Sequence, residues 1–434
     1  MIRKTVLDNG IRVISEKVEG VHSVSLGVWV ENGSRHESPA NNGISHFIEH
    51  MLFKGTSRRS AQDIAREIDS VGGMLNAFTS REYSCFFAKV LGGKLALAMD
   101  LLSDILLNSV FDPEELEKER SVILQELHMT SDTPEDYVHD LFYEGLWKDH
   151  PLGLPVLGTL DSVSGLKRDT ILETLRRRYC GERILVTAAG DLEHDEVARA
   201  IELAFAELPS GEKPVNGRLP VYHPRFDVLE RDLEQVHICF GTRSFPQNHH
   251  QRYEAYLLNT LLGGSMSSRL FQGVREEKGL AYSIYSYLNC HSDAGAMVIY
   301  AGTSPEKAQE VVELVLTEMQ RLKKEAVSAE ELCRGRDQLK GTLYLSQENT
   351  DYRMTRLAKN EIYFGRQIPI DEVAAGFDNV SAGSLLEKTQ HLFEDESLNI
   401  QMVGRVSPTD YLDAKPSLSV DMGENWRNDG RSCS

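Results

Sequence analysis

The feature that most constrains the fold of this chain is an internal repeat. The segment FDPEELEKERSVILQELHMTSDTPEDYV, which begins at Phe111, aligns without gaps with VSAEELCRGRDQLKGTLYLSQENTDYRM, which begins at Val327. An earlier pair, HFIEHMLFKG from His46 and AYLLNTLLGG from Ala255, also aligns, and β-rich sequence follows each member. Self-similarity of this kind indicates an ancient duplication. The chain is therefore predicted to consist of two homologous halves.

The boundary between the halves is predicted at a segment rich in proline and glycine. LPSGEKPVNGRLPVYHP, which begins at Leu208, has the composition of a linker and lies near the midpoint of the 434 residues. Each half carries strand and helix patterns typical of an α+β fold, with helices packed on an antiparallel-rich sheet. The predicted division is 1–208 for an N-terminal domain, 209–224 for the linker, 225–414 for a C-terminal domain and 415–434 for a loosely ordered tail.

Composition and charge disfavour several classes of protein. With 41% apolar and 26% charged residues, the chain has the composition of a soluble globular protein. It contains no run of about 18 apolar residues, the length that a membrane-spanning helix needs. The formal net charge of −19 disfavours nucleic acid and anionic lipid as partners, because both bind cationic patches. We therefore expect neither a nucleic acid nor a membrane partner.

The expected compartment is the cytoplasm. The six cysteines are scattered without a CxxC pair, which favours a reducing environment and argues against a disulfide framework or a cysteine-based zinc site. Apolar residues alternate on both sides of Asp8-Asn9-Gly10 near the N-terminus. This pattern predicts a β-hairpin of the folded domain rather than a signal or transit peptide.

The stretch HFIEH in the first half has the residue types of a zinc site. On a helix, residues four apart lie about 40° from each other around the axis, so His46 and His50 can direct both imidazoles to one point. Glu49 flanks the same face and can reach a water beside the metal without binding the metal itself. Zinc lowers the pKa of such a water to about 7. Taken alone, the stretch is also compatible with the solvated face of an amphipathic helix.

A catalytic zinc needs a third protein ligand, and a second helix offers one. This helix is predicted to begin with Asp112 as its N-cap and Pro113 at its first position. Glu119 and Glu126 are seven residues apart along it, hence on one face. Glu126 lies in the apolar setting VILQEL, where an unpaired carboxylate is costly.

The second half provides an internal control for these polar residues. All five are replaced in the aligned copy, whereas apolar positions of the first helix stay apolar. A polar face kept only for solvation would survive in some form, so the joint loss favours a metal site that one copy discarded. The aligned pairs are His46 with Ala255, Glu49 with Leu258, His50 with Asn259, Glu119 with Gly335 and Glu126 with Thr342.

Together these motifs resemble the inverted-motif zinc peptidases of the insulinase or pitrilysin family, closest to their short-chain, processing-peptidase-like branch. The resemblance rests on HFIEHMLFKGT and ERSVILQEL and extends to about residue 410. It implies one Zn²⁺ per chain, held by His46, His50 and Glu126. It also implies that Glu49 is the general base and that Glu119 supports the site without binding the metal.

The resemblance further implies how a substrate is held. GGMLNAFTS would contribute an edge strand on which the backbone of an extended peptide pairs, with Asn76 and Ala77 at the contact. Read alone, Asn76 is also compatible with a turn. REEKGLAYSIY matches an arginine and a tyrosine of the family, so Arg275 and Tyr282 are expected to hold the substrate and stabilise the developing oxyanion. Without the resemblance, these two would be interpreted as an exposed arginine and a packed tyrosine.

Family members of this length form one half of a clamshell chamber, which implies a dimer. Because this chain carries both the zinc set and the arginine and tyrosine pair, a homodimer is expected. The predicted function is that of a zinc metalloendopeptidase acting on short or unfolded peptides. The alternatives are a non-catalytic core or assembly subunit, and the catalytic half of a heterodimeric processing peptidase with an inactive sister chain.

Overall fold

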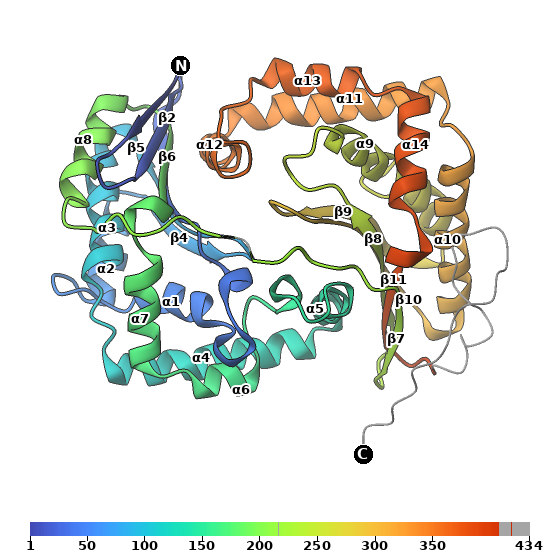
Figure 1. Ribbon diagram of the computed structural model, residues 1–434, viewed down its shortest axis with the longest axis horizontal. Coiled ribbons are helices and arrows are strands. Elements are labelled where there is room, and N and C mark those ends of the chain that lie inside the picture. The colour runs from blue at the N-terminus through green and yellow to red at the C-terminus, as the bar shows by residue number, and fades with distance from the viewer. Residues whose placement is uncertain (216, 408–417, 419–434) are drawn as a thin grey trace. The chain divides into compact units, whose positions relative to one another are not determined.

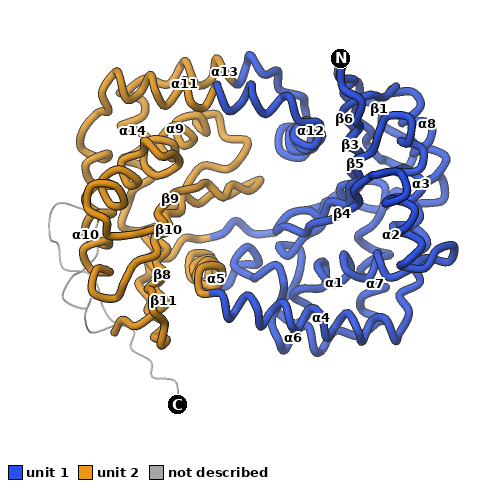
Figure 2. Tube along the Cα trace, turned by 180° about the vertical axis from the view of Figure 1, so that it is seen from behind, with its two compact units in different colours: residues 1–133, 149–220, 341–373 blue, residues 134–148, 221–340, 374–434 orange. Residues whose placement is uncertain are grey.

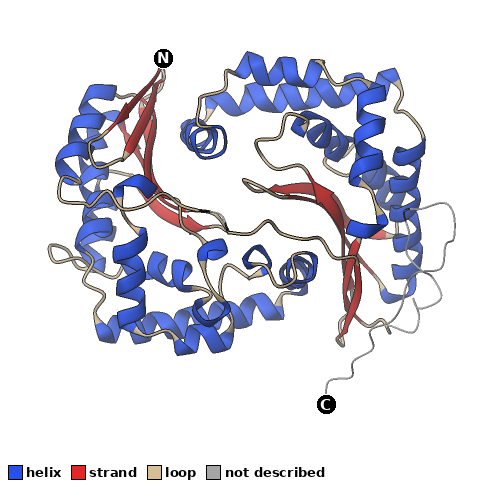
Figure 3. Cartoon of the chain, viewed as in Figure 1, coloured by secondary structure: helices blue, strands red, loops and turns tan. Residues whose placement is uncertain are grey.

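The computed structural model describes residues 1–215, 217–407 and 418, and within them the chain forms two β-sheets with helices packed against them (Figure 3). The chain divides into two compact units (Figure 2). Unit 1 comprises residues 1–133, 149–220 and 341–373, and unit 2 comprises residues 134–148, 221–340 and 374–434. The predicted two-domain α+β fold class is confirmed. Among the described residues, no helix is both long and apolar enough to cross a bilayer.

Most of the elements are labelled in Figure 1, where the colour runs along the chain. The strands are β1 (Ile2–Val6), β2 (Arg12–Lys17), β3 (Ser23–Val30), β4 (Met74–Thr79), β5 (Ser84–Leu91), β6 (Ile184–Gly190), β7 (Arg225–Glu230), β8 (Val236–Ser244), β9 (Ala281–Cys290), β10 (Gly295–Thr303) and β11 (Asn399–Gly404). The α-helices are α1 (Ile44–Leu52), α2 (Ala61–Ser70), α3 (Leu95–Asn108), α4 (Pro113–Asp132), α5 (Pro134–Leu146), α6 (Leu160–Gly165), α7 (Arg168–Arg178), α8 (His194–Ala204), α9 (Arg252–Leu262), α10 (Ala308–Lys324), α11 (Ala329–Leu345), α12 (Thr350–Phe364), α13 (Ile370–Asp378) and α14 (Ala382–Leu392).

The duplication is visible in the topology of the two sheets. The first sheet has the order β1-β2-β6-β3-β5-β4, and the second has the order β7-β11-β8-β10-β9. In each, one pair is parallel, β2 with β6 and β7 with β11, and the remaining pairs are antiparallel. The second sheet therefore repeats the first strand for strand, apart from β1. That extra strand pairs with β2 as the predicted N-terminal hairpin.

Both faces of the first sheet are covered. Along β3, Val24, Leu26 and Val28 belong to the large core that includes α1 and α3, whereas Trp29 belongs to a smaller cluster on the opposite face. That cluster is completed by residues of α12, including Met354. A strand buried on both faces has a nearly continuous run of buried residues, as β3 does.

Each compact unit contains one helix from the other half of the repeat. Helix α12, which follows α11 in the second half, packs on β2, β3 and β6 of unit 1, and α5, which follows α4 in the first half, packs on β8 and β11 of unit 2 (Figure 2). The two contiguous domains predicted from the sequence did not include this exchange, because periodicity shows that a helix has an apolar face but not which sheet it covers. The limits 1–208 and 225–414 stay a prediction for the homologous halves.

The predicted linker and tail have little or no described structure of their own. Apart from residue 216, which is not described, the stretch 209–224 contains no helix or strand. The tail predicted for 415–434 lies outside the described residues except for Leu418, which is buried in the core of unit 2.

Candidate metal centre

The first turn of α1 is fixed by a buried carboxylate. Glu37 Oε2 accepts a hydrogen bond from the backbone N–H of Gly43 at 2.7 Å, and its Oε1 accepts one from that of Ser45 at 2.9 Å. Gly43 has a φ of +88°, and a Cβ on it would lie 2.6 Å from the carbonyl oxygen of Leu157, so only glycine fits there. The apolar side of α1 packs into the core through Phe47 and its neighbours, which leaves the histidines on the side facing α4.

Helix α4 begins as the sequence predicts. The side chain of Asp112 accepts hydrogen bonds from the backbone N–H groups of Glu114 and Glu115, and Pro113 occupies the first position. Leu116 and Ile123 anchor the helix in the core of unit 1. Helices α1 and α4 pack against each other.

The three predicted metal ligands lie together where these helices meet. One donor atom from each of His46, His50 and Glu126 lies within 4.8 Å of the others. Glu126 Oε2 lies 3.5 Å from His50 Nε2 and 3.7 Å from His46 Nε2. The two imidazole rings are inclined by 71° with their centroids 4.6 Å apart. Both Nε2 atoms are therefore directed towards one carboxylate oxygen.

The distances between these donor atoms suit ligands of one zinc ion better than they suit hydrogen bonds between the side chains. At 3.5 and 3.7 Å the contacts are longer than hydrogen bonds, and the buried Glu126 Oε2 has no hydrogen-bond partner among the described residues. Two ligands about 2.1 Å from a tetrahedral zinc lie about 3.4 Å apart, close to this spacing. Burial, reinforced by His50, lowers the pKa of His46 to about 3. His46 is therefore neutral at physiological pH, the form in which imidazole binds metals.

Glu119 makes the hydrogen bond that orients His50. Its Oε2 lies 3.0 Å from His50 Nδ1, which assigns the proton to Nδ1 and leaves Nε2 as the metal-binding nitrogen. The other oxygen, Oε1, lies 2.6 Å from Nζ of Lys54, two residues beyond the end of α1. The sequence predicted the supporting role of Glu119 but missed Lys54, whose position four residues after His50 was the available signal.

Glu49 lies beside the ligands and is held by the neighbouring sheet. The hydroxyl of Thr79, the last residue of β4, donates a hydrogen bond to Glu49 Oε2 and lies 3.1 Å from Ser84 Oγ. Burial raises the pKa of the Glu49 carboxyl, and the bond from Thr79 opposes this effect. A carboxylate with a raised pKa is a stronger base. Thr79 was missed from the sequence, although the alternation along NAFTS places it on the same face as Ala77.

The predicted substrate strand is an edge strand. β4 is the last strand of the first sheet and pairs with β5 alone. Asn76 is exposed on it, and its Oδ1 accepts a hydrogen bond at 2.8 Å from the backbone N–H of Ala77. Asn76 is therefore in a strand, so its interpretation as a turn residue was wrong.

Arg275 and Tyr282, both in unit 2, lie next to each other. Arg275 is in the π-helical segment Phe271–Glu277, and its guanidinium carbon lies 5.2 Å from the ring centroid of Tyr282 and 4.6 Å from that of Phe271. Tyr282 is on β9 and is 81% exposed, which overturns its interpretation as a packed tyrosine. Phe271 is an additional residue that sequence reasoning did not find.

Comparison with known proteins places the chain in a family. The model described as Insulinase (Peptidase family M16) matches residues 12–160, and the model described as Peptidase M16 inactive domain matches residues 165–339. The chain belongs to the insulinase family, peptidase family M16. The first of the two matches contains the candidate metal centre, and the second match, described as an inactive domain, covers most of the half that lacks the candidate ligands.

Relatives within the M16 family are close over most of their length. An uncharacterized zinc protease of Bacillus subtilis is 39% identical over 396 residues, 91% of this chain and 97% of that protein. An uncharacterized zinc protease of Streptomyces coelicolor is 38% identical over 427 residues, 96% of this chain and 89% of that protein. These relatives and the family support a zinc-dependent metallopeptidase with peptides as substrates.

Solved structures share the fold at low identity. A protease from Helicobacter pylori superposes with a TM-score of 0.87 at 20% identity and covers 93% of this chain and 99% of its own. A chain of complex III2 from Candida albicans gives a TM-score of 0.83 at 22% identity and covers 94% of this chain and 97% of its own. At these identities the likeness is one of fold alone.

Proposed function

We propose that this chain is a zinc metalloendopeptidase that hydrolyses short or unfolded peptides. The observation that carries the proposal is the convergence of three side chains of metal-binding type within 4.8 Å, beside a half-buried carboxylate, that of Glu49, which is not one of them. In this proposal His46, His50 and Glu126 hold one Zn²⁺ per chain. The metal, when bound, polarises the peptide carbonyl and makes a neighbouring water more acidic.

Glu49 moves the proton in this proposal. Its carboxylate accepts a proton from the attacking water and then delivers it to the nitrogen of the departing amine, the usual exchange of base and acid roles. Thr79 restricts the rotation of the carboxylate through its hydrogen bond, so that one oxygen stays oriented. Glu119 keeps the His50 ring in its metal-binding tautomer.

Backbone pairing along β4 is the proposed mode of substrate binding. An extended peptide can add to the free edge of this strand, and pairing of this kind depends little on the peptide's sequence. The backbone N–H of Ala77 already donates a hydrogen bond to Oδ1 of Asn76. A carbonyl oxygen of the substrate would have to displace this side-chain oxygen in order to accept the same hydrogen bond. Arg275 and Tyr282 are proposed to hold the substrate and stabilise the negative charge that develops on the carbonyl oxygen.

A homodimer in the cytoplasm is the proposed working form, with each chain contributing one half of a clamshell chamber. The support is that one chain carries both the metal set and the arginine and tyrosine pair. Light scattering on the purified chain tests this directly. A species of twice the chain mass is expected, whereas an inactive monomer would point to a heterodimer, and co-purification with dissimilar chains would point to an assembly subunit.

Digestion of a mixed peptide library tests the proposed activity. The purified chain should cut peptides internally, lose this activity after treatment with a chelator and regain it when zinc is restored. Mass spectrometry of the products separates internal cleavage from trimming of the ends. Activity that survives complete removal of the metal, or products shortened only from one end, would contradict the proposal.

A further inference from the structure

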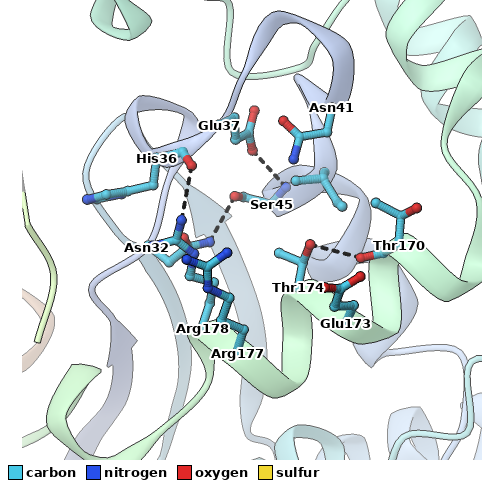
Figure 4. A pocket seen from close by; sticks show the side chains of 11 residues that line it. Asn32, His36, Glu37, Asn41, Ser45, Thr170, Glu173, Thr174, Arg177 and Arg178 are labelled. Carbon is cyan, nitrogen blue, oxygen red and sulfur yellow. Dashed lines mark hydrogen bonds between the residues drawn. The ribbon is translucent and has the colours of Figure 1, made fainter. Parts of the chain in front are cut away.

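A second polar site lies in unit 1, separate from the metal ligands. It is a cavity of about 180 Å³ between α7 and the segment that leads into α1 (Figure 4). Thr170, Arg177 and Arg178 line it from α7, and Asn41 and Ser45 line it from the other side. None of the three predicted metal ligands is among its lining residues.

Two of the lining side chains are arginines that make no ion pair with any described residue. Among the described residues, neither Arg177 nor Arg178 has a carboxylate within ion-pair distance, and Arg178 Nη2 donates only a long hydrogen bond, 3.5 Å, to the backbone carbonyl of His36. Burial lowers the pKa of Arg178, and the neighbouring guanidinium groups of Arg183 and Arg177 lower it further. Two carboxylates, those of Glu37 and Glu173, also line the cavity, but neither is within ion-pair distance of these arginines.

The two carboxylates that line the cavity make other contacts or none. Glu37 is buried, and its two oxygens accept hydrogen bonds from Asn42, Gly43 and Ser45, so it is used to cap α1. Glu173 also lines the cavity, but it is exposed and makes no ion pair with a described residue. The guanidinium N–H groups of Arg177 and Arg178 are therefore not engaged by either of these carboxylates.

Neutral donors complete the site. Oδ1 of Asn41 accepts a hydrogen bond from the backbone N–H of Ser38, which leaves the Nδ2 group of Asn41 as a donor. Thr170 contributes a hydroxyl from the first turn of α7. The pKa of His36, lowered to about 4 by burial and then by Arg178, keeps that ring neutral, so it adds no charge. Guanidinium forks beside amide and hydroxyl donors match the oxygens of a tetrahedral anion.

We propose that this cavity binds a small oxyanion of the phosphate class, with Arg177 and Arg178 as its charged ligands. The bound anion would join the last turn of α7 to Asn41 in the segment that leads into α1. It would thereby stabilise the approach of that segment to α7. Arginines in the last turn of a helix also interact favourably with its dipole, and the test must separate this structural role from anion binding.

Calorimetric titration of the zinc-loaded full-length protein tests the proposal. Inorganic phosphate and glycerol phosphate are titrated in separate arms, at constant ionic strength set with chloride, to distinguish a free anion from a phosphoryl group on a larger molecule. We expect saturable binding in at least one arm. Arg177→Gln and Arg178→Gln should each weaken it at least tenfold, and the matched control Arg176→Gln, an exposed neighbour that does not line the cavity, should leave it unchanged.

Several results would overturn the proposal. One is the absence of phosphate binding to the parent protein, and another is an equal loss of phosphate affinity in Arg176→Gln. A third is loss of binding in Glu126→Gln, because the anion would then be sitting on the metal. If Arg178→Gln does not fold, the exposed Arg177→Gln decides alone. The inference does not rest on the proposed peptidase function, since phosphate binding without peptide cleavage would leave it standing.

Discussion

The two helix pairs α1 with α4 and α9 with α11 occupy equivalent places in the two halves and differ at the point where the helices meet. In the first half, Glu119 reaches across to His50 at 3.0 Å. In the second half, Gly335 stands at the position of Glu119, and a Cβ there would lie 2.8 Å from side-chain atoms of Leu257 and Leu261. The second pair thus packs through apolar side chains at the place where the first pair holds its polar residues.

This difference shows that the fold does not need the metal residues. Asn259, the counterpart of His50, uses its Oδ1 to accept a hydrogen bond at 2.8 Å from Ser286 Oγ, a contact internal to its own half. Leu258, the counterpart of Glu49, is buried in the core of unit 2. The second half therefore packs without polar groups of this kind at the positions of Glu49 and His50.

The largest expected effect comes from removing the base in the first half. Glu49→Gln keeps the shape of the side chain but cannot accept the proton, so kcat/KM for peptide hydrolysis should fall by about 10²–10⁴-fold. Zinc content should stay the same, because Glu49 is not one of the clustered donors. Steady-state cleavage of a quenched peptide measures the first quantity and metal analysis the second. Full activity in this variant would remove Glu49 from the mechanism.

Restoring the lost carboxylate to the second half should damage the fold. Gly335→Glu forces a charged side chain against Leu257 and Leu261, and we expect the free energy of unfolding to fall by about 2–4 kcal/mol. The matched control is Gly341→Glu on the same helix, where a Cβ meets nothing within 4 Å. Denaturant titration compares the two. Equal stability of both variants would mean that the close packing of α9 with α11 is unimportant.

A smaller effect is expected at the carboxylate that orients His50. Glu119→Gln weakens the hydrogen bond to Nδ1, so the affinity for zinc should fall about 10–100-fold. Competition with a chelator of known affinity measures it. Glu117→Gln, at an exposed position of the same helix, provides the control and should bind zinc as the parent does. An unchanged affinity in Glu119→Gln would show that His50 is oriented by other contacts.

The smallest effect is predicted for the lysine that steadies Glu119. Lys54→Met keeps the length of the side chain and removes the ion pair to Glu119 Oε1. Since partly exposed ion pairs contribute up to about 1 kcal/mol, zinc affinity should fall by at most about fivefold. Lys118→Met, which removes an exposed pair with Glu115, should change nothing. If zinc affinity fell more in Lys54→Met than in Glu119→Gln, Lys54 would not act on the metal site through Glu119, which would contradict this prediction.

Much of the fold was predictable because the sequence repeats. The alignment of the two halves agrees with the repeated strand order, and the cap at Asp112 located the start of α4 correctly. The exchange of α5 and α12 was not predictable, because their partners are set by contacts distant in sequence. Ser25 Oγ, for example, donates a hydrogen bond to Thr350 at 2.8 Å across 325 residues.

The candidate site was predictable where spacing alone brings residues together. The four-residue spacing of His46 and His50 and the seven-residue spacing on α4 are consequences of helix geometry. The joint loss in the second half singled out both Glu119 and Glu126, and the choice of Glu126 as the third ligand came from the family resemblance. Thr79 was missed because its contact with Glu49 depends on how β4 lies beside α1, which no local pattern encodes. The cavity beside α7 was missed for the same reason, since residues 32–45 and 170–178, which line it, are far apart in the sequence.

The central claim is that one half of the repeat holds zinc and the other does not. Metal analysis of three purified proteins, the parent chain, Glu126→Gln and Thr342→Ala, tests it most directly. Thr342 is the exposed counterpart of Glu126 in the second half. The account predicts one zinc per chain in the parent and in Thr342→Ala, and almost none in Glu126→Gln. A full zinc in Glu126→Gln, or its loss in Thr342→Ala, would contradict it.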